Sequence, residues 1–212
     1  MISLFKSAEP QTAASFFDLR YTEHEGWVAT LGAMPGHRID PDTGKEDFSE
    51  QRRVREYLEN WRPTEPWIPQ EICLHFEDEG RPLKRADRVF HNAVGPIFSE
   101  NAVQKMRSFI DESGYALELK VMNVQENFYL FWVPWLAGSV DFDCSQKTRD
   151  NRFVTKYALN PTIVRGRTAF RPHYEGAYKP EAQGTVLVSD EFRQAWIAAG
   201  LTGIEFKEAT IP

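Results

Sequence analysis

The chain has 212 residues, with 25 Lys and Arg against 31 Asp and Glu, and a formal net charge of −6. Hydrophobic residues make up 42% of it and charged residues 26%, which excludes a disordered chain, a coiled coil and a collagen-like repeat. A chain of this length can bury about 70% of its unfolded surface, enough for a core without disulfides or metals.

The sequence predicts a soluble cytoplasmic protein. Its longest apolar run, residues 128–137, contains Pro134 and falls short of the roughly 18 residues that cross a bilayer. The N-terminus lacks the basic start and apolar block of a secretory signal. Cys73 and Cys144 are too few for a disulfide framework and predict two reduced thiols, with Cys144 expected in a buried apolar setting.

The first part of the chain is expected to be β-rich with one helix. Residues 48–61 place their apolar side chains on one helical face, and Ser49 is a suitable N-cap. Pro63, Pro66 and Pro69 then predict an extended connector. Strands are expected at residues 15–21 and 27–33, around the polar turn 22–26, and at residues 72–77.

Two later segments follow the same order: a strand, a Ser N-cap, an amphipathic helix, a Gly and a second strand. The first is 97–120, where Ser99 is the expected cap. The second is 186–207, with Ser189 as the cap and Gly200 at the helix end. Further strands are expected at residues 128–136, 162–170 and 185–188.

These elements predict an α+β fold, a mainly antiparallel sheet with about three helices packed on it. Residues 1–95 form the β-rich part with one helix, and residues 96–212 form an α+β part. We expect the two parts to pack together as one compact unit.

Charge is unevenly distributed along the chain. Residues 9–50 hold nine acids and three bases, whereas residues 147–171 hold seven bases and one acid. In the basic stretch Phe153, Tyr157 and Phe170 alternate with cations, a pattern that could stack nucleic-acid bases and contact phosphates. The overall pI of about 5.5 argues against that function.

No catalytic or metal-binding motif is complete. No two histidines have zinc-site spacing, and residues 40–47 differ from a calcium loop because Gly44 stands at position five instead of six. Asp141 and Asp143 could serve acid–base chemistry if one were desolvated, but capping or solvation is the favoured interpretation. We therefore predict no enzyme activity, no metal and no cofactor.

Residues 97–145 and 186–206 carry a family resemblance. The first runs from Ile97-Phe98-Ser99 to Val140-Asp141-Phe142-Asp143-Cys144-Ser145, and the second from Val186-Leu187-Val188-Ser189 to Gly203-Ile204-Glu205-Phe206. This pattern resembles the bacterial immunity proteins of polymorphic toxin systems, typified by a Myxococcus immunity domain and first catalogued as a domain of unknown function. The motif residues are expected to act as caps, turns and core: Ser99, Asp141, Asp143, Ser145, Ser189, Gly200 and Gly203.

The resemblance implies a cytoplasmic antidote that binds and occludes the toxin domain encoded beside it, one delivered by a type VI or related secretion system. An acidic surface would suit a basic, nuclease-like toxin. The expected contacts lie on an exposed acidic loop, with two tryptophans as weaker choices that core burial explains better: Asp40, Asp42, Glu46, Asp47, Glu50, Trp132 and Trp135.

Two alternatives stay open at this point. The chain could be an enzyme that reverses the toxin's modification through Asp141 or Asp143. It could also be a nucleic-acid-binding module that uses the basic stretch 147–171.

Overall fold

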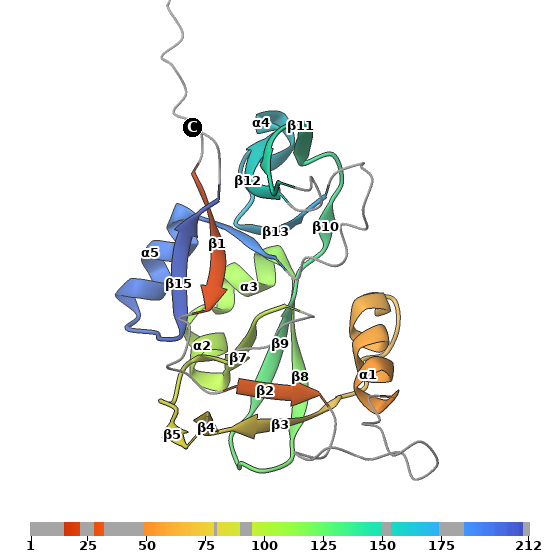
Figure 1. Ribbon diagram of the computed structural model, residues 1–212, viewed down its shortest axis with the longest axis vertical. Helices are drawn as coiled ribbons and strands as arrows, with labels where there is room; N and C mark the ends of the chain where they lie inside the picture. The colour runs from red at the N-terminus through yellow and green to blue at the C-terminus, as the bar shows by residue number, and fades with distance from the viewer. Residues whose placement is uncertain are drawn as a thin grey trace, which may run out of the picture.

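The computed structural model describes residues 15–21, 28–31, 49–78, 80–89, 95–149, 154–173 and 185–209. This part of the chain forms an elongated α+β molecule whose sheets are mainly antiparallel (Figure 1), so the predicted fold class is confirmed. Its helices are α1 (Ser49–Asn60), α2 (Glu100–Lys105), α3 (Arg107–Ser113), α4 (Pro161–Val164) and α5 (Asp190–Ala198).

A six-stranded sheet occupies one end of the molecule. It holds, in spatial order, β2 (Val28–Leu31), β3 (Glu71–His75), β8 (Tyr115–Val121), β9 (Phe128–Trp132), β7 (Ile97–Ser99) and β6 (Arg88–Val89). Only the β3–β8 pair in it is parallel.

The apolar strand β9 is covered on both faces, which explains its nearly continuous run of hydrophobic residues. Leu130 and Trp132 join a core that is covered by Val54 of α1 and by Trp61, which directly follows this helix. The alternate residue Phe131 joins a second core, formed with α2, α3 and α5. Both cores therefore depend on the alternation of side chains along one strand.

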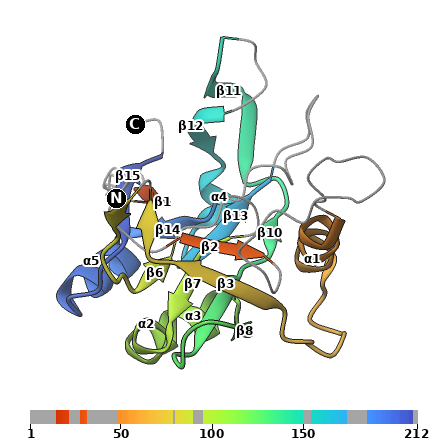
Figure 2. The ribbon, with the colours of Figure 1, turned by 60° about the horizontal axis from the view of Figure 1, so that its bottom comes forward.

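A five-stranded sheet contains strands from both ends of the chain. Its spatial order is β10 (Trp135–Leu136), β13 (Ala169–Pro172), β14 (Leu187–Ser189), β1 (Phe16–Tyr21) and β15 (Ile204–Glu208). Two small hairpins complete the structure: β11 (Val140–Lys147) with β12 (Val154–Leu159), and β4 (Glu77–Asp78) with β5 (Arg81–Pro82). The β11–β12 hairpin projects from the body of the molecule (Figure 2).

β1 and β2 do not form the local hairpin that the turn at residues 22–26 indicates. β1 lies between β14 and β15, antiparallel to both. β2 pairs with β3 in the other sheet. Strands from residues 1–95 are thus built into both sheets beside strands from residues 96–212.

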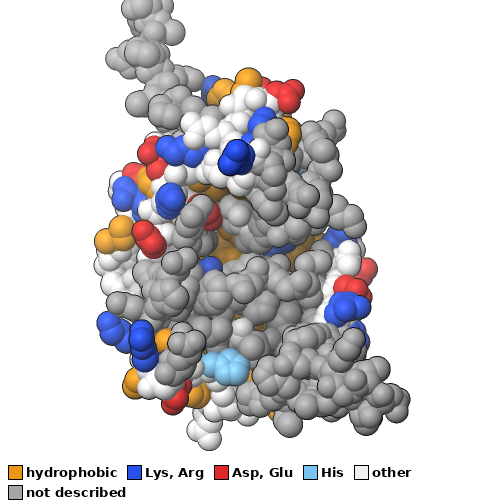
Figure 3. Space-filling model, viewed as in Figure 1, with side chains coloured by type: hydrophobic (Ala, Val, Ile, Leu, Met, Phe, Trp, Pro, Cys, Tyr) orange, Lys and Arg blue, Asp and Glu red, His pale blue; other side chains and the backbone are white. Residues whose placement is uncertain are grey.

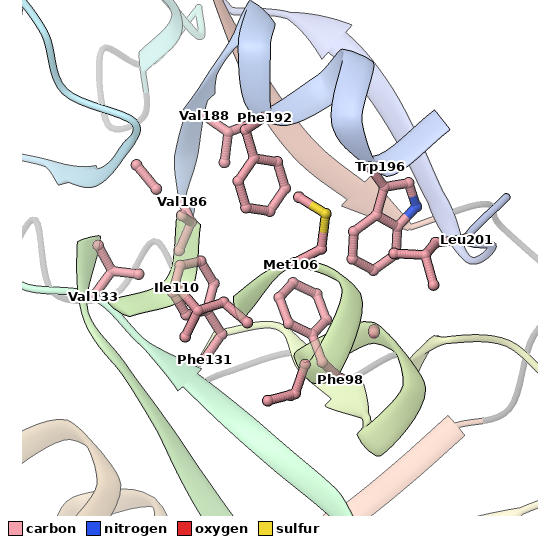
Figure 4. Close-up of a cluster of buried hydrophobic side chains, with 13 residues drawn as sticks. Phe98, Met106, Ile110, Phe131, Val133, Val186, Val188, Phe192, Trp196 and Leu201 are labelled. Atoms are coloured by element: carbon pink, nitrogen blue, oxygen red, sulfur yellow. The ribbon is translucent and has the colours of Figure 1, made fainter. Parts of the chain in front are cut away.

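The two strand–helix–strand units pack their helices against one aromatic core (Figure 4). The ring centroid of Phe98, from the first unit, lies 5.1 Å from that of Trp196, from the second. Phe131 of β9 stacks on Phe192 of α5 with a centroid distance of 6.3 Å. Ser99 and Ser189 cap α2 and α5 as predicted, each accepting a hydrogen bond from a backbone N–H one turn ahead.

Two expectations about the helices were wrong in detail. The helix predicted after Ser99 is interrupted at Met106, which separates α2 from α3. The strand predicted at residues 162–170 begins as the one-turn helix α4, because Asn160 supplies a side-chain cap and Pro161 suits the first helical turn. None of the helices among the described residues has the length and apolar character to span a bilayer.

Candidate functional site

Most of the predicted acidic contacts lie outside the described residues. Asp40, Asp42, Glu46 and Asp47 belong to that group. Glu50 stands in the first turn of α1, and its side chain is likewise not described.

Trp132 is a core residue and does not offer its side chain to a partner. It is only 7% exposed, and its ring meets that of Trp61 edge to face at 5.3 Å and that of Tyr115 at 5.9 Å. The physical reason is strand alternation, which directs Trp132 toward the face that α1 covers. The weaker expectation of a partner contact at Trp132 is therefore corrected.

Trp135 lies in β10 and is half-buried at the surface. The guanidinium carbon of Arg171, itself buried, lies 5.3 Å from the centroid of the indole ring and supports it from one side. Trp135 also lines a hollow of about 90 Å³ at the surface.

A larger hollow of about 360 Å³ lies next to it. Both are lined by Glu112 at the end of α3 and by Gly166, Arg167 and Thr168 in the connection from α4 to β13. We call the two hollows together the 112–168 groove. It extends from Trp135 at its narrow end to the first turn of α5 at its wide end.

The rim of the 112–168 groove is acidic. Glu112, Asp190 and Glu191 line it, against the single base Arg167. Asp190 is held by Arg193 at 2.6 Å. Within the described part of the chain, the carboxylates of Glu112 and Glu191 take part in no ion pair. The groove therefore joins an aromatic wall to uncompensated negative charge.

A second hollow of about 390 Å³ lies beside the β8–β9 turn, with Lys120 and Glu126 in its lining. Lys120 and Glu126 are already paired, since Arg85 binds Glu126 at 2.7 Å and Lys120 binds Glu71 at 2.6 Å, whereas Glu118 in the same lining takes part in no ion pair among the described residues. This surface has less charge left for a partner than the 112–168 groove.

Asp141, Asp143 and Ser145 form a bulge on β11. Between Asp141 and Gln146 the register with β12 shifts by several residues. The Asp141 carboxylate accepts a hydrogen bond from the Cys144 N–H at 3.0 Å, and the Ser145 hydroxyl donates to the Asp141 carbonyl. Lys147 donates to the carbonyl of residue 142 at 2.8 Å, so side chains fix the conformation of this exposed bulge.

The bulge does not provide a desolvated acid. Hydrogen bonds from the Cys144 backbone and side chain hold the pKa of Asp141 below its ordinary value, which keeps the carboxylate ionised. Cys144 is exposed instead of buried as expected, and its hydrogen bond to Asp141 raises the pKa of the thiol. A raised thiol pKa is the opposite of what a cysteine nucleophile requires.

Sequence reasoning missed the most heavily hydrogen-bonded carboxylate among the described residues, Asp87. It is 6% exposed and accepts hydrogen bonds from the side chains of Ser99 at 2.9 Å and Asn101 at 2.8 Å. The backbone N–H of Thr202 adds another at 3.1 Å. Burial alone would raise the pKa of Asp87, but these hydrogen bonds outweigh it and lower the pKa.

Asp87 joins the two strand–helix–strand units. Ser99 begins the helix of the first, and Thr202 lies in the turn between α5 and β15 of the second. Gly203 in that turn has φ of +88°, and a Cβ there would lie 2.4 Å from the Arg88 carbonyl oxygen. Nothing in the sequence near Asp87 signals this role, since the contact spans more than 100 residues.

The two described aromatic residues of the predicted stacking set in the basic stretch 147–171 are buried and cannot stack on bases. Tyr157 is 3% exposed and Phe170 is 1% exposed, both within a core under β13 and β14, and Phe153 is outside the described residues. Arg149 and Arg165 are exposed, and Lys and Arg side chains gather over α4 and β12 in Figure 3. Among the described residues, this surface is basic and exposes neither Tyr157 nor Phe170 for stacking.

The described residues hold no group of three or more His, Cys, Asp or Glu side chains placed to bind a metal ion. Comparison with known proteins found no family model that matches this sequence and no matching curated protein. The resemblance of residues 97–145 and 186–206 to immunity proteins therefore remains a prediction.

Proposed function

We propose that this chain is a bacterial immunity protein, which binds the toxin domain encoded beside it and neutralises that toxin by occlusion. The toxin would be one delivered by a type VI or related secretion system, and the chain would act in the cytoplasm of the producing cell. The sequence pattern of residues 97–145 and 186–206 is the observation that carries this proposal.

The structure adds physical support to the proposal. The two segments that carry the pattern contribute strand–helix–strand units to a shared aromatic core, so they form a rigid scaffold. A preorganised surface binds a partner with little loss of conformational entropy. The net charge of −6 would speed association with a basic toxin domain through long-range attraction.

Co-expression tests the proposal directly. The C-terminal domain of the secreted protein encoded by the neighbouring gene should arrest growth when expressed alone, and the full chain should restore growth. The two purified proteins should co-elute from a size-exclusion column. Continued arrest, with both proteins soluble and abundant, would overturn the proposal.

A double variant separates occlusion from the enzymatic alternative. Replacing both Asp141→Asn and Asp143→Asn removes the only carboxylates of the bulge while keeping its size. Occlusion predicts that this variant protects cells as well as the wild type does. Loss of protection with unchanged toxin binding would instead favour an enzyme that reverses the toxin's modification.

A further inference from the structure

We propose that the 112–168 groove docks an extended, basic segment of a protein partner. The inference rests on the proposed function for the identity of that partner, which would be the toxin domain. The shape, the lining and the charge of the groove support docking of such a segment.

The shape of the groove suits an extended segment. Two hollows of about 360 and 90 Å³ share Glu112, Gly166, Arg167 and Thr168 in their linings, so a wide and a narrow hollow lie next to each other along this surface. Specific interfaces concentrate binding energy where an anchor side chain fills a pocket beside an aromatic wall. The narrow part, with Trp135 in its wall, has the character of such an anchor pocket.

Charge selects a basic occupant over an acidic one. The carboxylates of Glu112 and Glu191 are unpaired within the described residues, and Arg167 is the single base in the lining. A concave surface with low-dielectric walls concentrates the field of its charges. An acidic segment would meet net repulsion in this groove, whereas arginine and lysine side chains would meet net attraction.

A peptide titration tests the groove without the toxin. The probe is a peptide of four Arg-Gly repeats, and its matched control has four Glu-Gly repeats. With the full ¹⁵N-labelled chain, the basic peptide should shift the amide signals of Gly166 and Thr168 and the indole signal of Trp135 most strongly. Shifts scattered over the whole surface, or equal shifts with both peptides, would overturn the inference.

Charge variants make this test sharper. Glu112→Lys with Glu191→Lys should weaken binding of the Arg-Gly peptide about tenfold, because two attractive contacts become repulsive. Glu118→Lys with Glu205→Lys makes the same change of net charge at exposed positions outside the groove, and should change affinity less than twofold. Equal weakening by both pairs would show general attraction only and would refute a specific groove.

A variant that binds the Arg-Gly peptide more tightly distinguishes docking in the groove from a general loss of the fold. Arg167→Glu removes the only base in the groove lining and should tighten binding of the Arg-Gly peptide about threefold. A misfolded variant would not bind more tightly. Unchanged or weaker binding by this variant, with an intact fold by circular dichroism, would contradict the inference.

The last measurement is the binding of the toxin domain itself to the charge variants. Glu112→Lys with Glu191→Lys should weaken binding of an inactive toxin domain, and the control pair should not. If the wild type protects cells while both pairs bind toxin equally, the groove inference fails and the proposed function stands. If no toxin is neutralised while the Arg-Gly peptide docks in the groove, the proposed function fails and the groove inference stands.

Discussion

The carboxylate of Asp87 is buried and forms no ion pair with a described residue, and hydrogen bonds from Ser99, Asn101 and Thr202 stabilise its ionised form. A buried carboxylate accepting several such bonds titrates below its ordinary pKa of 3.8. The ionised state of Asp87 therefore stabilises the folded protein at neutral pH, and protonation removes that stabilisation.

We expect Asp87→Asn to lower the free energy of unfolding by about 2 kcal/mol at pH 7, since an amide cannot accept all these bonds. Because the pKa of Asp87 is lower in the folded state, wild-type stability should begin to fall as the pH drops below the ordinary value of 3.8 and should keep falling through the lower pKa of the folded state. The variant lacks this group, so its stability should vary less below about pH 4. Urea denaturation across this pH range measures both effects, and parallel curves for the two proteins would contradict the assignment.

Gly203 and Gly200 provide a matched pair of glycine substitutions. Both have positive φ, +88° and +67°, but only at Gly203 would a Cβ meet backbone, 2.4 Å from the Arg88 oxygen. Gly203→Ala should lower the free energy of unfolding by more than about 2 kcal/mol. Gly200→Ala, which meets no atom within 4 Å, should cost about 1 kcal/mol from its backbone conformation alone.

Chemical denaturation of the two alanine variants tests this difference. Equal losses of unfolding free energy would mean that the turn relaxes around the added methyl group. The close approach of Gly203 to Arg88 would then have no effect on stability.

At the scale of the elements, helix α5 buries one face in the core and exposes another to solvent. Phe192 and Trp196 are fully buried in the shared aromatic core, whereas Ile197 is 58% exposed. The two neighbouring apolar positions, 196 and 197, therefore have different energetic roles. Their difference follows from the helical period and not from hydrophobicity.

We expect Trp196→Ala to lower the free energy of unfolding by about 3–5 kcal/mol, because it opens a cavity beside Phe98 and Phe192. Ile197→Ala on the same helix should change it by less than about 0.5 kcal/mol. Thermal or urea unfolding measures both, and comparable losses would show that the helix packs differently.

Elements with strong local signals could be predicted from the sequence. The helix expected at residues 48–61 is α1, and the Ser caps of α2 and α5 stand where the sequence places them. The break at Met106 and the bulge after Asp141 could not be predicted, because long-range packing and side-chain bonding determine them. Strand pairing also escaped prediction, since local pattern does not specify the partners of β1.

The candidate site was only partly visible in the sequence. Trp135 was expected to be a weaker partner contact, and the structure places it in the wall of the 112–168 groove. Glu112 and Arg167 have no pattern that separates them from other surface charges. They become neighbours only because α3 and the connection after α4 pack together in the folded chain.

At the scale of the whole molecule, the N-terminal and C-terminal parts are interlaced. β1 lies inside the five-stranded sheet, between β14 and β15, and β3 lies inside the six-stranded sheet. Removing residues 1–95 would leave unpaired backbone groups and uncovered apolar surface in both sheets. The two parts should therefore be unable to fold apart.

We expect a fragment of residues 96–212 to lack a cooperative thermal transition and near-ultraviolet circular dichroism. Adding a separately expressed fragment of residues 1–95 should restore both signals if the two fragments associate. A sharp transition in the C-terminal fragment alone would show that it is an independent domain.

The position of β1 has a consequence for the newly made protein in a cell. Phe17 pairs with Val188 and Glu208, near the opposite end of the chain. At about 5–20 residues per second, the ribosome needs roughly 10 to 40 seconds to make the strands that flank β1. Until then β1 lacks both of its neighbouring strands, so the five-stranded sheet is completed only after β15 has been made. A chain whose synthesis stops before β14 therefore cannot complete the five-stranded sheet.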